Sequence, residues 1–160
     1  MPAIHAKRRV HHNANAMFDL VADVERYPEF VPHCQRHIIV ARKKSGTSEL
    51  LITDMTIARG PFRETIRSRD TLDRENGRIR VEAVGRTLQR LQTVWTFEPH
   101  GGHSCDVGFD TVYEFSSLPM ELLLGGIFDS TFRYFVHSFE RRADLLYGRH
   151  SGRGSANAAH

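Results

Sequence analysis

Long apolar runs are missing from this 160-residue chain: no segment approaches the ~20 apolar residues that a membrane-spanning helix requires. Residues 1–9 (MPAIHAKRR) also lack the apolar core of a secretory signal, and they lead directly into a segment with strand character. We therefore expect a cytoplasmic protein, or one in an equivalent compartment after removal of a presequence.

Cysteine is scarce, and the two that occur, Cys34 and Cys105, belong to no CxxC pair. A disulfide framework and a zinc site are therefore not expected, and both thiols should be reduced and buried. The histidines fit no standard metal site, and no acid or cysteine completes one. They include His11, His12, His33, His37, His100, His103 and His137. No metal and no cofactor is expected.

Signatures of catalysis are also missing. The chain has no G-x-S-x-G nucleophile motif, no phosphate-binding loop and no acid at a strand end with an obvious histidine partner. Strand alternation is expected to turn Asp54 and Glu64 away from the cavity. We therefore expect a protein that is not an enzyme.

Charge of one sign is not in large excess, because 22 Lys and Arg residues stand against 19 Asp and Glu residues, for a formal net charge of +3. This diffuse basic excess permits contact with anionic lipid or RNA without requiring it. The length suits one domain, predicted over residues 1–149. Residues 150–160 are small, polar and Gly-rich, which predicts a disordered tail.

Strand patterns fill the middle of the chain, and short Gly-containing turns between them predict antiparallel hairpins. A helix is expected over residues 13–24 and a short second helix or turn over 29–31, where Pro28 and Pro32 break the pattern. The predicted strands are 4–11, 37–44, 48–58, 62–73, 78–83, 88–98 and 105–115.

A long apolar helical pattern begins at Pro119 and extends to about Gly148. This is the one element long and apolar enough to fill the concave side of a seven-stranded sheet. The order β-α-α-β6-α therefore predicts an α+β helix-grip architecture, with a curved antiparallel sheet around a long C-terminal helix. Such a fold tends to leave a cavity between sheet and helix.

Residues 17–34 (MFDLVADVERYPEFVPHC) resemble the opening motif of the START-like coenzyme Q-binding proteins. The same START/Bet v 1-like superfamily includes polyketide cyclase-like proteins and ribosome-association toxins. Further similarities are Pro61-Phe62 after a glycine, Trp95-Thr96-Phe97, and Phe109 with Phe115. The resemblance implies a non-catalytic protein that binds ubiquinone and supports respiratory electron transport as a carrier. Its partners would be ubiquinone or a related prenyl lipid, a membrane surface and respiratory complexes.

The candidate ligand cavity is assigned to apolar side chains of the Tyr-Pro-Glu-Phe-Val-Pro turn, the inner sheet face and the C-terminal helix. Aromatic residues at such positions are usually core, and the functional alternative is that they line a tunnel for a prenyl chain. Candidate donors to a quinone carbonyl are Trp95, Tyr113 and Thr53. The assigned lining residues are Phe30, Pro32, Met55, Trp95, Phe97, Val107, Phe109, Phe128 and Phe132.

The start of the C-terminal helix is apolar all round, so some of its side chains must be exposed or covered by another element. It is assigned as an entrance that touches a membrane while a lipid passes, which places the protein peripherally at the inner membrane. Close packing or a dimer interface is the alternative. The assigned residues are Leu122, Leu123, Leu124, Gly125, Gly126 and Ile127.

Arginines alternate along the strand predicted over residues 62–73, at Arg63, Arg67 and Arg69. This pattern is typical of a solvated convex face, and such a face also attracts lipid head groups or ribosomal RNA. Two alternative functions therefore stay open. One is a ribosome-associated interaction module, which needs the basic residues gathered into one patch. The other is a cyclase or dehydratase-type enzyme, which needs a buried acid–base pair in the cavity.

Overall fold

The computed structural model describes residues 2–148. Its strands are β1 (Ala3–Val10), β2 (Cys34–Ser45), β3 (Ser48–Arg59), β4 (Phe62–Asp73), β5 (Arg78–Ala83), β6 (Leu88–His100) and β7 (Ser104–Phe115). Its helices are α1 (Ala14–Ala22), the 3₁₀ helix η1 (Val24–Glu29), α2 (Leu118–Arg133) and α3 (Phe135–Tyr147). The predicted tail at 150–160 lies outside the described residues.

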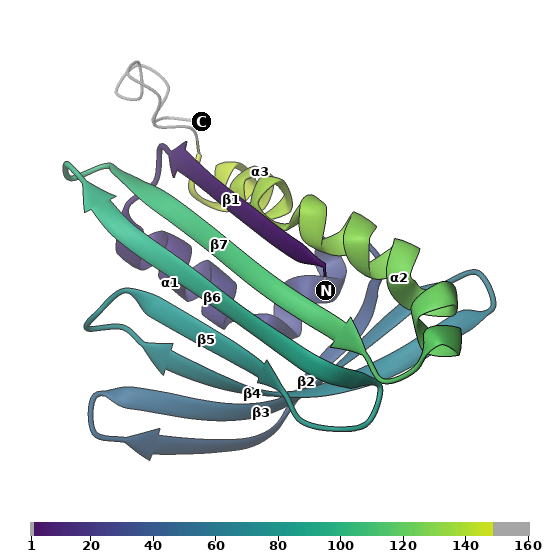
Figure 1. Cartoon of the computed structure of the whole chain (residues 1–160). Helices are drawn as coiled ribbons and strands as arrows, with labels where there is room; N and C mark the ends of the chain where they lie inside the picture. Colours follow the sequence, from purple (N-terminus) through teal and green to yellow (C-terminus); the bar gives the residue numbers. More distant parts are fainter. Residues whose placement is uncertain (1, 149–160) are drawn as a thin grey trace.

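The strands form one seven-stranded antiparallel sheet in the order β1-β7-β6-β5-β4-β3-β2. Consecutive strands from β2 to β7 are neighbours joined by short turns, as the Gly-containing breaks predict. The first strand joins the far edge beside β7, so α1 and η1 carry the chain across to β2. The predicted α+β helix-grip fold is confirmed, with the sheet curving around the helices (Figure 1).

Side-chain alternation decides which face of the sheet is buried. Along β7, Val107, Phe109, Tyr113 and Phe115 are buried on the inner face, whereas Asp110 on the outer face is exposed. The aromatic side chains of α2 and α3 pack against this inner face, so one apolar core joins the sheet to the C-terminal helices.

The long C-terminal helical segment is interrupted at Tyr134, which separates α2 from α3. Thr131 is fully buried, and its hydroxyl donates to the Ile127 carbonyl at 2.8 Å. A threonine that bonds back to the preceding turn bends a helix, because its hydroxyl competes with the backbone amide for the same carbonyl. The apolar spacing continues across the break, so the sequence pattern does not reveal it.

Two predicted helix boundaries need correction. The first helix ends at Ala22 rather than at residue 24, and the short second helix lies over Val24–Glu29 instead of residues 29–31. Pro28 sits inside this 3₁₀ helix, near its end, where the missing amide of proline is tolerated more easily than in an α-helix interior. The Tyr27 hydroxyl donates to the Val21 carbonyl and so fixes the turn between α1 and η1.

Candidate functional site

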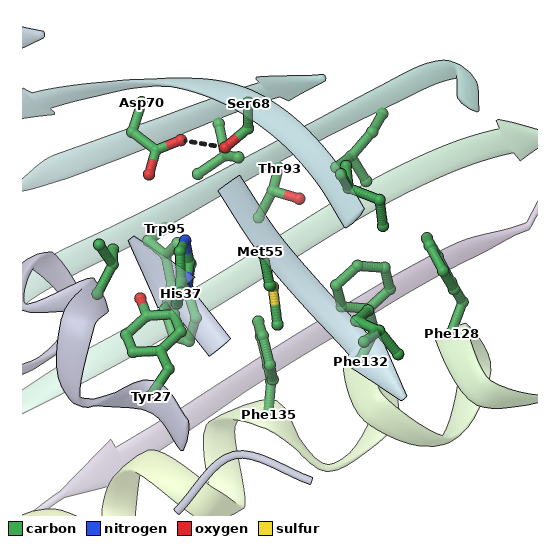
Figure 2. A pocket seen from close by; sticks show the side chains of 15 residues that line it. Tyr27, His37, Met55, Ser68, Asp70, Thr93, Trp95, Phe128, Phe132 and Phe135 are labelled. Atoms are coloured by element: carbon green, nitrogen blue, oxygen red, sulfur yellow. Dashed lines mark hydrogen bonds between the residues drawn. The ribbon is translucent and has the colours of Figure 1, made fainter. Parts of the chain in front are cut away.

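A small cavity of about 60 Å³ lies between the inner face of the sheet and the C-terminal helices. Figure 2 shows its wall: Met55 from β3 and Trp95 from β6 face Phe132 from α2 and Phe135 from α3. Apolar and aromatic surface therefore encloses most of the space. Such a wall suits an apolar ligand more than a charged one.

Four of the nine residues assigned to the cavity line it: Met55, Trp95, Phe128 and Phe132. The others lie outside this wall. Phe97, Val107 and Phe109 are buried in the surrounding core, and Phe30 packs edge-on against Phe139 with ring centroids 4.9 Å apart. The carbonyl of Pro32 lies 3.4 Å from the Thr131 hydroxyl, so the turn after η1 lies against α2, and Pro32 does not line the cavity.

A polar chain runs along one part of the otherwise apolar wall. The Nε2 atom of His37 lies 3.0 Å from the Thr53 hydroxyl, which lies 3.0 Å from the Ser68 hydroxyl. Ser68 in turn donates to the Asp70 carboxyl at 2.8 Å (Figure 2). All four side chains are buried, and all except Thr53 contribute to the cavity wall. We call them the polar chain.

Burial shifts the pKa values of both end groups toward the neutral form. Desolvation raises the pKa of Asp70 to about 6, although the hydrogen bond from Ser68 opposes the rise. Desolvation also lowers the pKa of His37 to about 4, with a small opposing effect of Asp54. Near neutral pH the imidazole is therefore uncharged, while Asp70 is mostly ionised and reaches its titration midpoint at about pH 6.

Sequence reasoning missed this polar chain, although one signal for it exists. Once Arg67 and Arg69 are assigned to the outer face of β4, alternation places Ser68 and Asp70 on the inner face. Asp54 does point outward, where its carboxylate pairs with Arg67 at 2.8 Å.

Glu64 lies outside the cavity wall, as expected, but alternation along β4 is not the reason. It lies on the same face of β4 as Ser68 and is half-buried, accepting a hydrogen bond from Thr87 at 2.8 Å. Because it sits near the start of the strand, its carboxylate is held by the loop between β5 and β6 and does not join the cavity wall.

The entrance segment divides into a buried and an exposed face. Leu124 and Ile127 are buried against the core, whereas Leu122 and Leu123 are 76% and 48% exposed. Gly126 is exposed and Gly125 is half-buried. Because only one side of the helix is covered, part of this all-round apolar segment has to face solvent. The start of α2 thus presents leucine side chains to solvent.

Three arginines on the outer face of β4 are exposed, and each is held by a polar neighbour. Arg67 pairs with Asp54, Arg69 lies 3.7 Å from Glu82, and Arg63 donates to Gln35. Each neighbouring acid cancels part of the basic charge, so the outer face carries both signs.

Within residues 2–148, no group of three or more His, Cys, Asp or Glu side chains has the geometry to hold a metal ion. Over the same residues, no helix combines the length and apolar character needed to cross a membrane. Cys34 and Cys105 are buried free thiols.

Two curated relatives are similar over most of the chain. The ribosome association toxin RatA of Pseudomonas aeruginosa is 30% identical over 135 residues, which cover 84% of this chain and 90% of the relative. The mitochondrial coenzyme Q-binding protein COQ10 homolog B of Xenopus laevis is 32% identical over 136 residues, which cover 83% of this chain and 54% of the relative. The chain thus spans about half the length of the second protein.

Solved structures share the fold. An 18 kDa protein of Caulobacter crescentus superposes with a TM-score of 0.73 at 24% identity, covering 92% of this chain and 99% of that one. The Zhui aromatase/cyclase of Streptomyces sp. R1128 superposes with a TM-score of 0.70 at 12% identity, covering 89% and 93%. Residues 10–140 match the family described as polyketide cyclase/dehydrase and lipid transport. With the helix-grip fold, the apolar cavity and this match in agreement, the chain belongs to the polyketide cyclase/dehydrase and lipid transport family.

Proposed function

We propose that this protein binds ubiquinone, or a similar prenyl lipid, in the cavity beneath α2 and carries it without making or breaking bonds. The observation that carries the proposal is the composition of the cavity wall, which is aromatic and aliphatic except for the polar chain. A quinone ring with an apolar tail needs this combination, since its carbonyl groups require hydrogen-bond partners and its prenyl units require apolar surface. The similarity to a coenzyme Q-binding protein supports this choice of ligand.

The cavity as it stands is too small for this ligand. Its volume of about 60 Å³ is well below the ~300–1,000 Å³ of typical ligand pockets. Binding therefore requires part of the wall to move. The first half of α2 is the best candidate, because Leu122 and Gly126 are exposed there and helix-weakening Gly125 and Gly126 follow one another.

Outward movement of α2 would expose more apolar surface beside leucines that already face solvent. Leu118 and Leu122 are 64% and 76% exposed, and Phe62 is 44% exposed at the same end of the sheet, as the pairing of β4 with β5 requires. A transient contact with a membrane would cover this surface while the lipid passes. Respiratory complexes would be the recipients of the carried quinone.

The test is native mass spectrometry with solvent extraction, applied to protein purified from a ubiquinone-producing host. Ubiquinone at a near-stoichiometric amount supports the proposal. A different lipid at a similar amount keeps the carrier function and discards ubiquinone. Protein that is empty and that also binds no added ubiquinone contradicts the proposal.

A ribosome-associated interaction module is the second candidate. It is favoured by the similarity to a ribosome association toxin, 90% of whose length is matched by this chain. On the outer face, however, acids interrupt the arginines, as the Arg67–Asp54 and Arg69–Glu82 pairs illustrate. Sedimentation of the protein with purified ribosomal subunits at about physiological salt separates the candidates, because a carrier should stay in the supernatant.

An enzyme of the cyclase or dehydratase type is the third candidate. The observation in its favour is that both an acid and a potential base, Asp70 and His37, line the same cavity. Two hydroxyl groups separate them, so they act on one another through Thr53 and Ser68 and not as a directly bonded pair. Recovery of a chemically altered product after incubation with an extracted ligand would favour the enzyme over the carrier.

A further inference from the structure

The number of hydroxyl protons in the polar chain fixes which group donates each hydrogen bond and which accepts it. Each of Thr53 and Ser68 has one hydroxyl proton and therefore donates one hydrogen bond. When Asp70 is ionised it can only accept, so Ser68 donates to Asp70 and Thr53 donates to Ser68. The Thr53 oxygen then accepts from His37, which must carry its proton on Nε2.

This assignment leaves the other ring nitrogen of His37 with a free lone pair. The Nδ1 atom is buried and has no hydrogen-bond partner among the residues that the structure describes. In this state it is an acceptor without a donor, within the wall of the cavity. A buried acceptor without a donor lowers the stability of the folded protein, and a ligand that donates a hydrogen bond to it removes this cost.

Protonation of Asp70 reverses the chain. The new carboxyl proton needs an acceptor, and the hydroxyl of Ser68 is the group that already lies within hydrogen-bond distance. Ser68 then donates to Thr53, and Thr53 donates to Nε2 of His37. The imidazole, which stays neutral, must now carry its proton on Nδ1. The balance is one proton gained: as it binds at Nδ1, Nε2 passes its proton to Thr53, Thr53 passes its own to Ser68, and Ser68 passes its own to Asp70.

We propose that the polar chain is a reversible head-group site that selects between the reduced and oxidised forms of a quinone. With Asp70 ionised, Nδ1 of His37 accepts a hydrogen bond and the site prefers a hydroxyl group, as in a quinol. With Asp70 protonated, Nδ1 donates and the site prefers a carbonyl group, as in a quinone. This inference rests on the proposed function, because it assigns the head group of the same ligand.

The surroundings leave Asp70 as the group that drives the reversal. The Tyr27 ring of η1 packs edge-on against His37 at 4.9 Å, but its hydroxyl is engaged by the Val21 carbonyl. Asp54 of β3 lies on the outer face in its pair with Arg67. The Cys34 thiol of β2 is buried, and burial raises its pKa to about 12, so it keeps its proton. The strands beside Asp70 place Leu51 and Val81 opposite it.

The protein provides its own reporter, because Trp95 is its single tryptophan and lines the cavity. Quenching of its fluorescence by ubiquinone-2, and under anaerobic conditions by ubiquinol-2, gives the dissociation constant of each form at about pH 5 and about pH 7.5, on either side of the Asp70 titration. We expect the ratio of the two constants to change by roughly tenfold between these pH values, which corresponds to about one net hydrogen bond. Tighter binding of ubiquinol-2 at the higher pH is the expected sense.

Two variants and a matched control isolate the chain. Asp70→Asn supplies either a donor or an acceptor to Ser68 at every pH, so both ligands should bind with a ratio that no longer depends on pH. Thr53→Val interrupts the chain while Asp70 still titrates, and it should also abolish the dependence. Thr93→Val is the control: Thr93 lines the same cavity but bonds to Thr111 at 2.7 Å, outside the chain, so the dependence should persist.

Nitrogen-15 NMR of the ring of His37 tests the reversal without any ligand. The proton is expected on Nε2 at about pH 7.5 and on Nδ1 at about pH 5, in line with the titration of Asp70. A ring whose tautomer does not change overturns the inference, even if both quinone forms bind and the carrier function stands. A tautomer that changes in a protein that binds neither form overturns the proposed function, and the assignment of a quinone head group falls with it.

Discussion

Burial of the Asp70 side chain raises the pKa of its carboxyl group and lowers the stability of the folded protein. Its side chain is 3% exposed and accepts a hydrogen bond from Ser68, so the ionised carboxylate is poorly solvated. The pKa rises to about 6 for this reason, above the ordinary value of 3.8. Relative to the unfolded chain, the folded protein therefore binds a proton more tightly and loses stability as the pH rises from about 4 through 6.

We predict that Asp70→Asn stabilises the protein near neutral pH. The amide keeps the size of the side chain and a hydrogen bond to Ser68 but carries no charge, so the variant escapes the loss of stability that the carboxylate causes as the pH rises from about 4 to 6. The gain over the parent should grow between about pH 4 and pH 6 to at most roughly 3 kcal/mol, from a pKa difference of about two units. Urea unfolding across this pH range measures it.

His37 titrates in the opposite sense but is present in both proteins, so its contribution cancels in the difference. Asp54→Asn on the outer face is the matched control. The pair with Arg67 lowers the pKa of Asp54, so its removal should give no gain above pH 6. A parent and an Asp70→Asn variant whose stabilities run parallel with pH would show that Asp70 is not desolvated in solution.

The residues of the polar chain show why sequence alone predicted the cavity wall only in part. Alternation can place Ser68 and Asp70 on the inner face of β4, and aromatic spacing can place Trp95 on that of β6. Alternation does not predict the hydrogen-bonded connection between Asp70 and His37. This connection depends on β3 lying between β2 and β4, where Thr53 bridges the two strands. Only the register of three strands brings these side chains together.

At the scale of the element, α2 combines a buried aromatic face with a middle segment of low helix propensity. Phe128 and Phe132 are buried, whereas Gly125 and Gly126 lower the helix propensity one turn earlier. Neither glycine has a positive φ, and a β-carbon would meet only Glu121 Cγ at 3.9 Å from Gly125 and open space at Gly126. Packing therefore does not require glycine at either position, which leaves helix flexibility as a reason for it.

We predict that the double change of Gly125→Ala and Gly126→Ala stabilises the protein but slows ligand uptake. Each alanine should favour the helix by up to about 1 kcal/mol. If α2 must bend or unwind to open the cavity, the same gain opposes opening, and ubiquinone-2 should quench Trp95 about tenfold more slowly. Stopped-flow fluorescence measures the rate and thermal unfolding measures the stability.

Asn15→Ala serves as the control for this prediction, since it improves the propensity of α1 at an exposed position remote from the cavity wall. It should raise the stability and leave the uptake rate unchanged. If the double alanine variant is more stable yet takes up ubiquinone-2 as fast as the parent, then α2 is not the moving part of the wall.

The C-terminal segment also marks a limit of sequence patterns at this scale. The three- and four-residue spacing of phenylalanines correctly predicted a long apolar helical segment over the sheet. The break at Tyr134 was not predicted, because the pattern shows which side of a helix is buried and not how far its axis bends. The Thr131 hydroxyl donates to the Ile127 carbonyl just before the break, and hydrogen bonds of this kind often bend helices.

The whole molecule has an asymmetry between its two ends. The start of α2 lies beside the end of β7, whereas the end of α3 lies near the end of β1 at the other end of the sheet (Figure 1). Exposed leucines occur at both ends, including Leu122 on α2 and Leu145 on α3, which are 76% and 79% exposed. The first group lies on α2, which supplies Phe128 and Phe132 to the cavity wall, whereas α3 contributes Phe135 from its start, at the opposite end of that helix from Leu145.

This asymmetry predicts which leucines matter for contact with a membrane. Leu122→Gln should weaken binding to vesicles of phosphatidylcholine with phosphatidylglycerol several-fold, because it removes an apolar side chain that the bilayer would cover. Leu145→Gln, a matched change of an equally exposed leucine at the opposite end, should leave binding unchanged. Vesicle co-sedimentation measures both variants.

The rate of ligand transfer to vesicles distinguishes a functional membrane contact from nonspecific adsorption. If lipid passes beside α2, then Leu122→Gln should also slow the movement of ubiquinone-2 from loaded protein to vesicles, while its affinity for ubiquinone-2 in solution stays near that of the parent. Equal losses in both leucine variants would indicate nonspecific adsorption. Slower transfer by Leu145→Gln alone would move the exit of the ligand to the other end of the molecule, where α3 and not α2 would have to open.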